Sequence, residues 1–318
     1  MSRIHEALKR AAQENAKRTT LEPQATIIEE VESAGRSVED AVKPKAEENR
    51  KVSEQPVVPV VPPRPVLRHA PVQSFDEILK NCSHPTWNLD PRINVFSETT
   101  LDKGSAERFR TLRSRLTQIA SSRKLNRILI TSSLPVEGKT FVALNLAQSM
   151  ARQVNRRVLL IDADLRAPRV HIAMGAPSTP GLTEYLQGDT DELGIIQQGQ
   201  EGNLCMIPCG MEAPNPSELL SNERLVKLFD WASNWFDWVL IDSPPTLPVH
   251  DASALADHCD GVLFIVRAGK TDYELAEKAV SEFRKKNLLG VVLNGVEKGE
   301  IYSDYYYDYD SSKSDRVE

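Results

Sequence analysis

Hydrophobic residues are distributed in two different patterns along the chain. From about residue 85, short apolar runs alternate with segments whose apolar positions recur at helical spacing. The pattern predicts strands at 127–131, 158–161, 238–241, 261–266 and 291–294, and helices at 105–121, 140–153, 216–234 and 273–286. Short, continuously apolar strands separated by helices are typical of a parallel sheet that helices cover on both faces. Residues 85–296 are therefore predicted to form one α/β domain with a mostly parallel sheet.

The segments outside this domain have other patterns. Residues 1–18 predict a short amphipathic helix, which is either a frayed terminus or a docking helix for a partner or a membrane. Residues 19–84 are rich in charges and then in proline. Such a segment buries too little apolar surface to offset the entropy lost on ordering, so it predicts a disordered linker. The polar residues 297–318 predict a disordered tail.

Charge and hydropathy exclude some classes of protein. The formal net charge is −6, whereas a general nucleic-acid binder usually carries a basic excess, so no nucleic-acid partner is expected. No stretch approaches 18 consecutive apolar residues, and no apolar signal-peptide core follows Met1. These features predict a cytoplasmic protein without a transmembrane segment of its own.

A phosphate-binding loop is predicted between the first strand and the helix that follows it. Residues 133–140 read Ser-Leu-Pro-Val-Glu-Gly-Lys-Thr, which matches the Walker A pattern except that Ser133 replaces the first glycine. The backbone N–H groups of such a turn, including those of Glu137 and Gly138, point at phosphate oxygens. Lys139 is expected to reach the β- and γ-phosphates, and Thr140 to offer its hydroxyl to Mg²⁺.

Acidic residues follow two other strands. Asp162 and Asp164 end the second strand and are followed by Arg166, and Asp242 ends the third. The carboxyl ends of parallel strands are where such sheets bind ligands, which favours metal and proton chemistry. The structural alternative is that aspartate caps the turn after a strand. An apolar strand that delivers Asp242 beside a metal ion is similar to a Walker B motif.

Together these motifs resemble the bacterial tyrosine autokinases of capsule and exopolysaccharide loci, in particular those of exosortase-linked exopolysaccharide loci. The family's DxDxR motif is matched by Asp162, Asp164 and Arg166, its acidic-strand-then-proline motif by Asp242 and Pro245, and its ExxRxxR helix by Glu107, Arg110 and Arg113. The chain departs from the family at Val136, where a glycine is usual. A β-branched residue disfavours positive φ, so a loop that needs this conformation would have to shift and bind nucleotide more weakly.

The resemblance implies a P-loop fold, ATP and Mg²⁺ as cofactors, and specific roles for the matched residues. Asp162 would act as general base, and Asp164 would bind Mg²⁺ together with Thr140 and Asp242. Lys139 and Arg166 would offset charge on the transferring group. Asn294 would contact adenine, although a turn residue before Gly295 is an equally good interpretation.

The resemblance also implies partners. Glu107, Arg110 and Arg113 form a stripe on one side of the predicted helix at 105–121, and this stripe would contact the next subunit of a homo-oligomeric ring. The alternative interpretation is that the stripe is a charged helix face exposed to solvent. A membrane-embedded chain-length (co-polymerase) protein would act as activator and hold the kinase at the inner membrane.

Tyrosines gather near the end of the chain. Five of the seven lie among aspartates in the tail, namely Tyr302, Tyr305, Tyr306, Tyr307 and Tyr309. Disordered segments are usually poor in aromatic residues, and aspartates interrupt every apolar face of this segment. The cluster therefore predicts an extended phosphoacceptor segment, modified in trans by a neighbouring subunit.

Two other functions share this fold. One is a non-kinase ATPase switch of the septum-site or partition type, which carries an additional lysine early in the loop where this chain reads Ser133-Leu134-Pro135. The other is a scaffold of a polysaccharide assembly complex that binds nucleotide weakly, which Val136 alone supports. Formation of phosphotyrosine with ATP and Mg²⁺ would separate the kinase from both.

Overall fold

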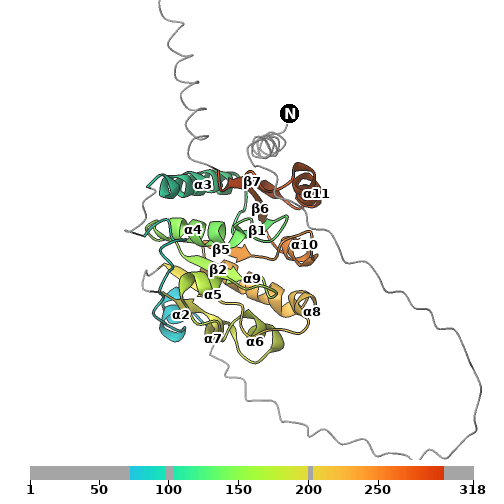
Figure 1. Ribbon diagram of the computed structural model, residues 1–318. Helices are drawn as coiled ribbons and strands as arrows, with labels where there is room; N and C mark the ends of the chain where they lie inside the picture. The colour runs from blue at the N-terminus through green and yellow to red at the C-terminus, as the bar shows by residue number, and fades with distance from the viewer. Residues whose placement is uncertain (1–71, 98–102, 200–202, 297–318) are drawn as a thin grey trace, which may run out of the picture.

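A seven-stranded sheet forms the centre of the protein, as the computed structural model shows (Figure 1). The structure describes residues 72–97, 103–199 and 203–296. Across the sheet the strand order is β3-β4-β2-β5-β1-β6-β7. The strands are β1 (Arg127–Ser132), β2 (Val158–Asp162), β3 (Gln197–Gln198), β4 (Leu204–Ile207), β5 (Trp238–Asp242), β6 (Gly261–Arg267) and β7 (Leu288–Asn294). All neighbours pair in parallel except β3 and β4, so the predicted mostly parallel sheet is confirmed.

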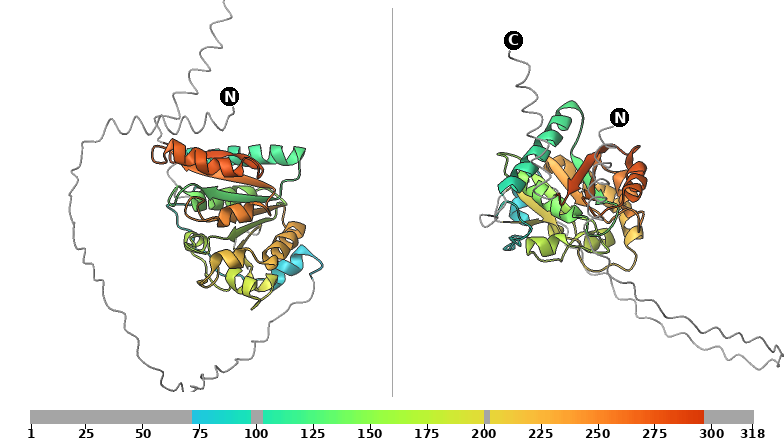
Figure 2. Two further views of the ribbon diagram at one scale, coloured as in Figure 1. Left: turned by 90° about the vertical axis from the view of Figure 1, so that its right-hand side faces the viewer. Right: turned by 45° about the horizontal axis from the view of Figure 1, so that its top comes forward.

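Helices cover both faces of the sheet (Figures 1 and 2). One face packs against α3 (Lys103–Ser122), α4 (Lys139–Ala151) and α5 (Val170–Met174). The other face packs against α2 (Phe75–Asn81), α6 (Leu182–Gln187), α7 (Glu192–Ile195), α8 (Pro216–Leu220), α9 (Glu223–Trp235), α10 (Asp251–Ala256) and α11 (Tyr273–Phe283). Within the described residues, no helix has the length and apolar character needed to cross a membrane.

Alternation along each central strand divides the core into two layers. In β1, Leu129 belongs to one hydrophobic cluster, whereas Ile128 and Ile130 belong to the cluster on the opposite face. This follows from the strand geometry, since successive side chains point to opposite faces of a sheet. Because both faces are buried, the strand must be apolar at every position, which explains the continuous hydrophobic runs in the sequence.

The strand register brings the acidic strand ends together. Asp162 at the end of β2 pairs with Asp242 at the end of β5, and Asp242 is also in register with Ile130 of β1. The Ala163 N–H donates to the Asp242 carbonyl at 2.8 Å. The phosphate-binding loop leaves β1 at the same edge, so all three motifs meet at the carboxyl ends of the strands.

Residues 72–84, which the sequence assigned to the disordered linker, belong to the folded part of the protein. Ser74 caps α2 by accepting a hydrogen bond from the Glu77 N–H, and Phe75 and Ile78 are buried. The ring of Phe75 packs edge-on against Phe236, with 5.3 Å between centroids. The linker assignment is therefore wrong for this stretch, because two large apolar side chains anchor it to the core.

Other differences concern short elements. The single helix predicted at 216–234 is two helices, α8 and α9, because the side chain of Asn222 accepts a hydrogen bond from the Arg224 N–H at 2.9 Å and begins a new helix. The sequence pattern did not indicate α5, α6, α7, β3 or β4. The predicted helix at 1–18, most of the linker and the tail at 297–318 lie outside the described residues.

Candidate active site

The loop between β1 and α4 has the backbone of a phosphate-binding turn. Gly138, the N-cap of α4, has a left-handed φ of 97°. A Cβ at this position would lie 2.0 Å from Asn294 Nδ2, so glycine is required on two grounds. Val136 adopts the left-handed φ of 66°, which is unusual for a β-branched residue, and its side chain is 83% exposed. The loop therefore keeps the left-handed conformation at this position although the residue is valine, and the expected shift of the loop does not occur.

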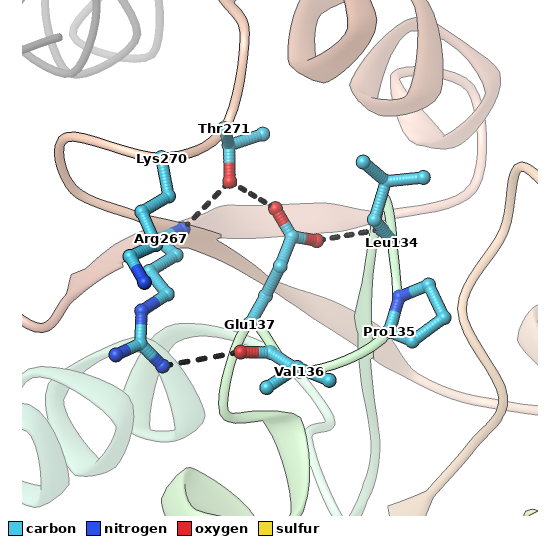
Figure 3. A pocket seen from close by; sticks show the side chains of 7 residues that line it. All are labelled: Leu134, Pro135, Val136, Glu137, Arg267, Lys270 and Thr271. Atoms are coloured by element: carbon cyan, nitrogen blue, oxygen red, sulfur yellow. Dashed lines mark hydrogen bonds between the residues drawn. The ribbon is translucent and has the colours of Figure 1, made fainter. Parts of the chain in front are cut away.

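Three side chains hold this loop in place: Arg267 at the end of β6 and Thr271 shortly after it, which Figure 3 shows, and Asn294 at the end of β7. Arg267 donates to the Val136 carbonyl at 3.2 Å, and Asn294 Nδ2 donates to the Glu137 carbonyl at 2.9 Å. The Glu137 carboxylate accepts from the Leu134 N–H at 2.7 Å and from the Thr271 hydroxyl. Burial raises the pKa of Glu137, although these hydrogen bonds oppose the shift. The buried side chain of Glu137 therefore holds the loop from inside.

The loop lysine and threonine each contact a carboxylate of another strand end. Lys139 Nζ donates to Asp164 Oδ2 at 2.7 Å, and the Thr140 hydroxyl donates to Asp242 Oδ2 at 2.6 Å. Asp162 accepts from the Val170 N–H at 3.0 Å and from the Asp164 N–H at 3.3 Å. These contacts join residues that lie up to 102 positions apart in the sequence.

The site holds more negative than positive charge. Asp162, Asp164 and Asp242 are all buried, as is Lys139. Burial, reinforced by the charge of Asp242, raises the pKa of Asp162 to about 8. Burial also raises the pKa of Asp242 to about 6, although Lys139 opposes this shift. Burial alone would lower the pKa of Lys139, but its attraction to Asp242 and Asp164 outweighs burial and raises it. A further cation would therefore be stabilised here.

Asp242 meets the requirements of a magnesium ligand. Its Oδ1 atom is buried and has no hydrogen-bond partner among the described residues, while Oδ2 is bound to the Thr140 hydroxyl. Among the described residues, no group of three or more His, Cys, Asp or Glu side chains is arranged to hold a metal ion by itself. Mg²⁺ prefers oxygen ligands, keeps several waters and often needs one or two carboxylates together with substrate phosphates. The donor set therefore fits Mg²⁺ held partly by a nucleotide.

Arg166 is anchored at the rim of the site by two residues that the sequence did not single out. Its Nε donates to Asp251 Oδ2 at 2.8 Å, and its NH2 group donates to the Ser217 hydroxyl at 2.8 Å. Ser217 in turn donates to Asp251 Oδ1 at 2.6 Å. Asp251 begins α10, next to the active edge of the sheet, and is buried. Asp251 lies 85 residues from Arg166 in the sequence, so no local sequence motif indicates that the two side chains meet.

The Glu107, Arg110 and Arg113 stripe divides into two parts. Arg110 and Glu107 are exposed and form an ion pair of 2.9 Å on α3. Arg113 is half-buried and donates to the Ser149 carbonyl of α4 at 2.6 Å. Arg113 thus links two helices of its own chain, whereas Arg110 and Glu107 face outward.

The structure brings together Lys139, Thr140, Asp162, Asp164 and Asp242, which the sequence had placed in one site. Ser133 is buried at the start of the loop, and its hydroxyl has no partner among the described residues. Sequence reasoning missed Arg267 and Thr271. Arg267 ends β6 as Asp162 ends β2 and Asp242 ends β5, so the criterion that selected the two aspartates could have found Arg267 but not Thr271. The tail tyrosines lie outside the described residues.

Comparison with known proteins agrees with this site. A family model described as an AAA domain matches residues 136–283. The chain is 38% identical to the tyrosine-protein kinase YwqD of Bacillus subtilis (strain 168) over 216 residues, which cover 67% of this chain and 90% of that protein. It is 36% identical to the tyrosine-protein kinase wzc of Salmonella typhimurium over 208 residues, which cover 64% of this chain and 29% of that protein.

A solved structure gives the same result. The kinase domain of the Escherichia coli tyrosine kinase ETK superimposes with a TM-score of 0.61 at 32% sequence identity, covering 68% of this chain and 83% of that domain. The sequence motifs, the geometry of the phosphate-binding loop and these comparisons all indicate the same family. The chain belongs to the family of bacterial tyrosine-protein kinases, and its phosphate-binding loop is that of a P-loop nucleotide-binding enzyme.

Proposed function

We propose that this protein transfers the γ-phosphate of ATP to tyrosines of its own C-terminal segment, residues 297–318, and thereby regulates exopolysaccharide or capsule synthesis. The observation that carries the proposal is the convergence of Lys139 and Thr140 with Asp162, Asp164 and Asp242 at one edge of the sheet. A second support is the group of five tyrosines within residues 302–309. Phosphoryl transfer to a tyrosine that enters such a site needs little more than positioning and charge neutralisation.

ATP binding changes the partners of the loop residues. The N–H groups of the loop and the start of α4 receive the phosphates, and Lys139 exchanges Asp164 for phosphate oxygens. Thr140, Asp242 and Asp164 would hold Mg²⁺, which neutralises charge on the phosphates and orients them for in-line transfer. Oδ1 of Asp242, which no described residue contacts by a hydrogen bond, supports this assignment.

Asp162 is the proposed general base. Burial and the neighbouring Asp242 raise its pKa in the metal-free protein. Bound Mg²⁺ would offset the charge of Asp242 and favour the ionised carboxylate, which can accept a proton. Because tyrosine hydroxyls are weak nucleophiles at neutral pH, a carboxylate that accepts the proton during transfer assists the reaction. Arg166, held by Asp251 and Ser217, offers its remaining donors to the entering segment or the transferring group.

Asn294 is proposed to lie beside adenine while it holds the loop. Its amide already donates to the Glu137 carbonyl, which places the end of β7 against the phosphate-binding turn. A base bound over this turn would meet the same strand end. Loss of this side chain would therefore affect both the loop and the nucleotide.

We further propose that the protein works as a homo-oligomer beside a separate membrane-embedded activator. The outward-facing Glu107 and Arg110 on α3 support a contact with a second copy. In a ring, each C-terminal segment would enter the site of a neighbour and be phosphorylated in trans. The activator would hold the ring at the inner membrane, where the polysaccharide machinery lies.

Phosphotyrosine mass spectrometry tests the kinase assignment. The full-length protein is incubated with ATP and Mg²⁺, and a variant with Tyr302, Tyr305, Tyr306, Tyr307 and Tyr309 changed to Phe is treated in parallel. The variant should bind ATP as tightly as the parent and should lose most of its phosphotyrosine. ATP hydrolysis without phosphotyrosine in the parent would contradict the proposal.

The two remaining tyrosines serve as internal controls. Tyr185 is buried and donates to Glu192 at 2.9 Å, so its hydroxyl is closed to an active site of another copy. Tyr273 begins α11 and is half-buried. If either carried most of the label, the tail would not be the main acceptor.

A further inference from the structure

A pocket of about 270 Å³ lies on the outer side of the phosphate-binding loop (Figure 3). One wall is the loop itself, with Leu134, Pro135, Val136 and the buried Glu137. The opposite wall is the turn between β6 and α11, with Arg267, Lys270 and Thr271. In the site described above, Arg267 and Thr271 of this second wall only hold the loop, and Lys270 has no role.

The two walls differ in chemistry. Pro135 and Val136 on the first wall are exposed, Val136 to 83%. Facing them, Arg267 and Lys270 supply two positive charges on one side of the pocket (Figure 3). Arg267 donates one hydrogen bond to the Val136 carbonyl. Lys270 is exposed and forms no ion pair with a carboxylate among the described residues.

The acidic groups near the pocket are turned away from it or occupied. Glu137 is buried, and its carboxylate is bound to the Leu134 N–H and the Thr271 hydroxyl. Asp272 accepts from the N–H groups of Glu274 and Leu275 as the N-cap of α11. The pocket therefore combines an apolar wall with a net positive wall, which suits an aromatic ring that carries an anionic group.

The segment that follows β7 in the sequence would carry such a group once its tyrosines are phosphorylated. β7 ends at Asn294, in register with Arg267, and a Cβ built on Gly295 would lie 3.8 Å from Arg267 Cγ and Nε. The last described residue is 296, and Tyr302 follows six positions later. Six residues of extended chain span about 20 Å, and the later tyrosines have longer tethers. Every tail tyrosine can therefore reach the pocket of its own chain.

We propose that this pocket binds a phosphotyrosine of the C-terminal segment, with the ring against Pro135 and Val136 and the phosphate on Arg267 and Lys270. The identity of this occupant rests on the proposed autokinase function. A phosphate bound there would compete with the Val136 carbonyl for Arg267, so the reaction product would act on the loop that binds the next ATP. The pocket would thus sense the reaction product through the phosphate-binding loop, which it shares with the nucleotide site.

The test measures binding of a synthetic peptide of residues 300–311 with Tyr306 phosphorylated, by fluorescence anisotropy. The receptor is the full-length chain with its five tail tyrosines changed to Phe, so that its own tail does not compete. The phosphopeptide should bind, and the unphosphorylated peptide should bind at least about tenfold more weakly, because the charge-assisted hydrogen bonds to phosphate are lost. Equal binding of the two peptides would overturn the proposal.

Substitutions then locate the site. Lys270→Glu should weaken phosphopeptide binding about tenfold or more, whereas Lys285→Glu, the same change at an exposed position beyond α11, should leave it nearly unchanged. Arg267→Ala should also weaken binding, but it releases the loop, so Lys270→Glu is the decisive variant. Equal affinity of the parent and Lys270→Glu proteins would overturn the proposal.

This binding measurement is independent of catalysis. If the protein forms no phosphotyrosine with ATP, the proposed function fails, while Lys270-dependent binding of the synthetic phosphopeptide would still support the pocket. If autophosphorylation persists and the phosphopeptide binds without regard to Lys270, the pocket assignment fails and the proposed function stands.

Discussion

Lys139 Nζ lies 2.7 Å from Asp164 Oδ2, so the lysine of the phosphate-binding loop is already ion-paired with a carboxylate from the end of the next strand. Both side chains are almost fully buried. A buried charge that loses its partner is costly, so the pair keeps Lys139 in position before nucleotide arrives. ATP binding must then replace Asp164 by phosphate oxygens, which frees this carboxylate to act elsewhere in the site.

Lys139→Ala should abolish ATP binding and tail phosphorylation. Loss of one preorganised contact of this kind costs about 3–4 kcal/mol in the transition state. Isothermal titration with ATP and a phosphotyrosine assay measure the two effects. The control is Lys286→Ala, which removes a lysine that pairs with Asp257 at 2.9 Å away from the site and should leave both activities intact. Undiminished autophosphorylation in Lys139→Ala would contradict the assigned site.

Raising the pH should destabilise the metal-free protein. The pKa of Asp162 is raised to about 8 in the folded state, chiefly by burial and then by Asp242. Its contribution to stability is therefore fully present below its unfolded pKa of about 4 and is lost as the pH rises through about 8. The melting temperature in EDTA should fall over this range, and Mg²⁺ with nucleotide should reduce the fall.

Asp162→Asn provides the control for this titration. The variant has no carboxylate to ionise at this position, so its melting temperature should depend less steeply on pH than that of the parent. Identical slopes in the two proteins would show that Asp162 is not the group responsible.

Val136→Gly should relieve strain in the loop. A β-branched residue at a φ of 66° costs about 1–3 kcal/mol, whereas glycine adopts this conformation freely and loses about 0.5–1 kcal/mol of chain entropy. We expect ATP affinity equal to or a few times higher than that of the parent, together with a small rise in melting temperature. Asn155→Gly is the matched control. Asn155 also has a left-handed φ of 58°, but it lies outside the loop, and asparagine adopts this conformation with little strain. A loss of ATP affinity in Val136→Gly would mean that the valine side chain itself supports binding.

Residues 72–83 should be essential for stability although the sequence assigned them to the disordered linker. Phe75→Ala removes a buried ring that packs on Phe236 and should cost about 3–5 kcal/mol in the free energy of unfolding. Deleting residues 19–71 should leave the melting temperature nearly unchanged, whereas deleting 19–83 should lower it markedly, because α2 is lost with its buried side chains. Equal melting temperatures of the two deletions would contradict the docking of α2.

Arg110 and Arg113 should separate assembly from stability. Arg110→Ala removes an exposed charge, which contributes about 0–1 kcal/mol to folding, so it should weaken self-association without lowering the melting temperature. Arg113→Ala should lower the melting temperature, because Arg113 links α3 to the Ser149 carbonyl of α4. Light scattering with Mg²⁺ and nucleotide, paired with thermal unfolding, measures both effects. Self-association unaffected by Arg110→Ala would argue against α3 as the subunit contact.

The sequence by itself determined the parallel α/β domain and the main residues of its site. Continuous apolar runs identify strands buried on both faces, and the position of Lys139 between a strand and a helix identifies a phosphate-binding turn. Because all parallel strands end at the same edge, Asp162 and Asp242 could be assigned to that edge before their register was known. These inferences depend on local pattern and on one general rule of sheet geometry.

The tertiary structure alone decided which side chains meet. Arg166 and Asp251 are 85 positions apart, and Arg267 and Val136 are 131 apart, so no local spacing indicates their hydrogen bonds. The same is true of Phe75 on Phe236, which converts the end of an apparent linker into part of the core. Such contacts depend on strand order and on how helices pack, and many arrangements of the same elements satisfy the same hydrophobic pattern. The pocket between the loop and the β6–α11 turn therefore exists only once β1 and β6 lie side by side in the sheet.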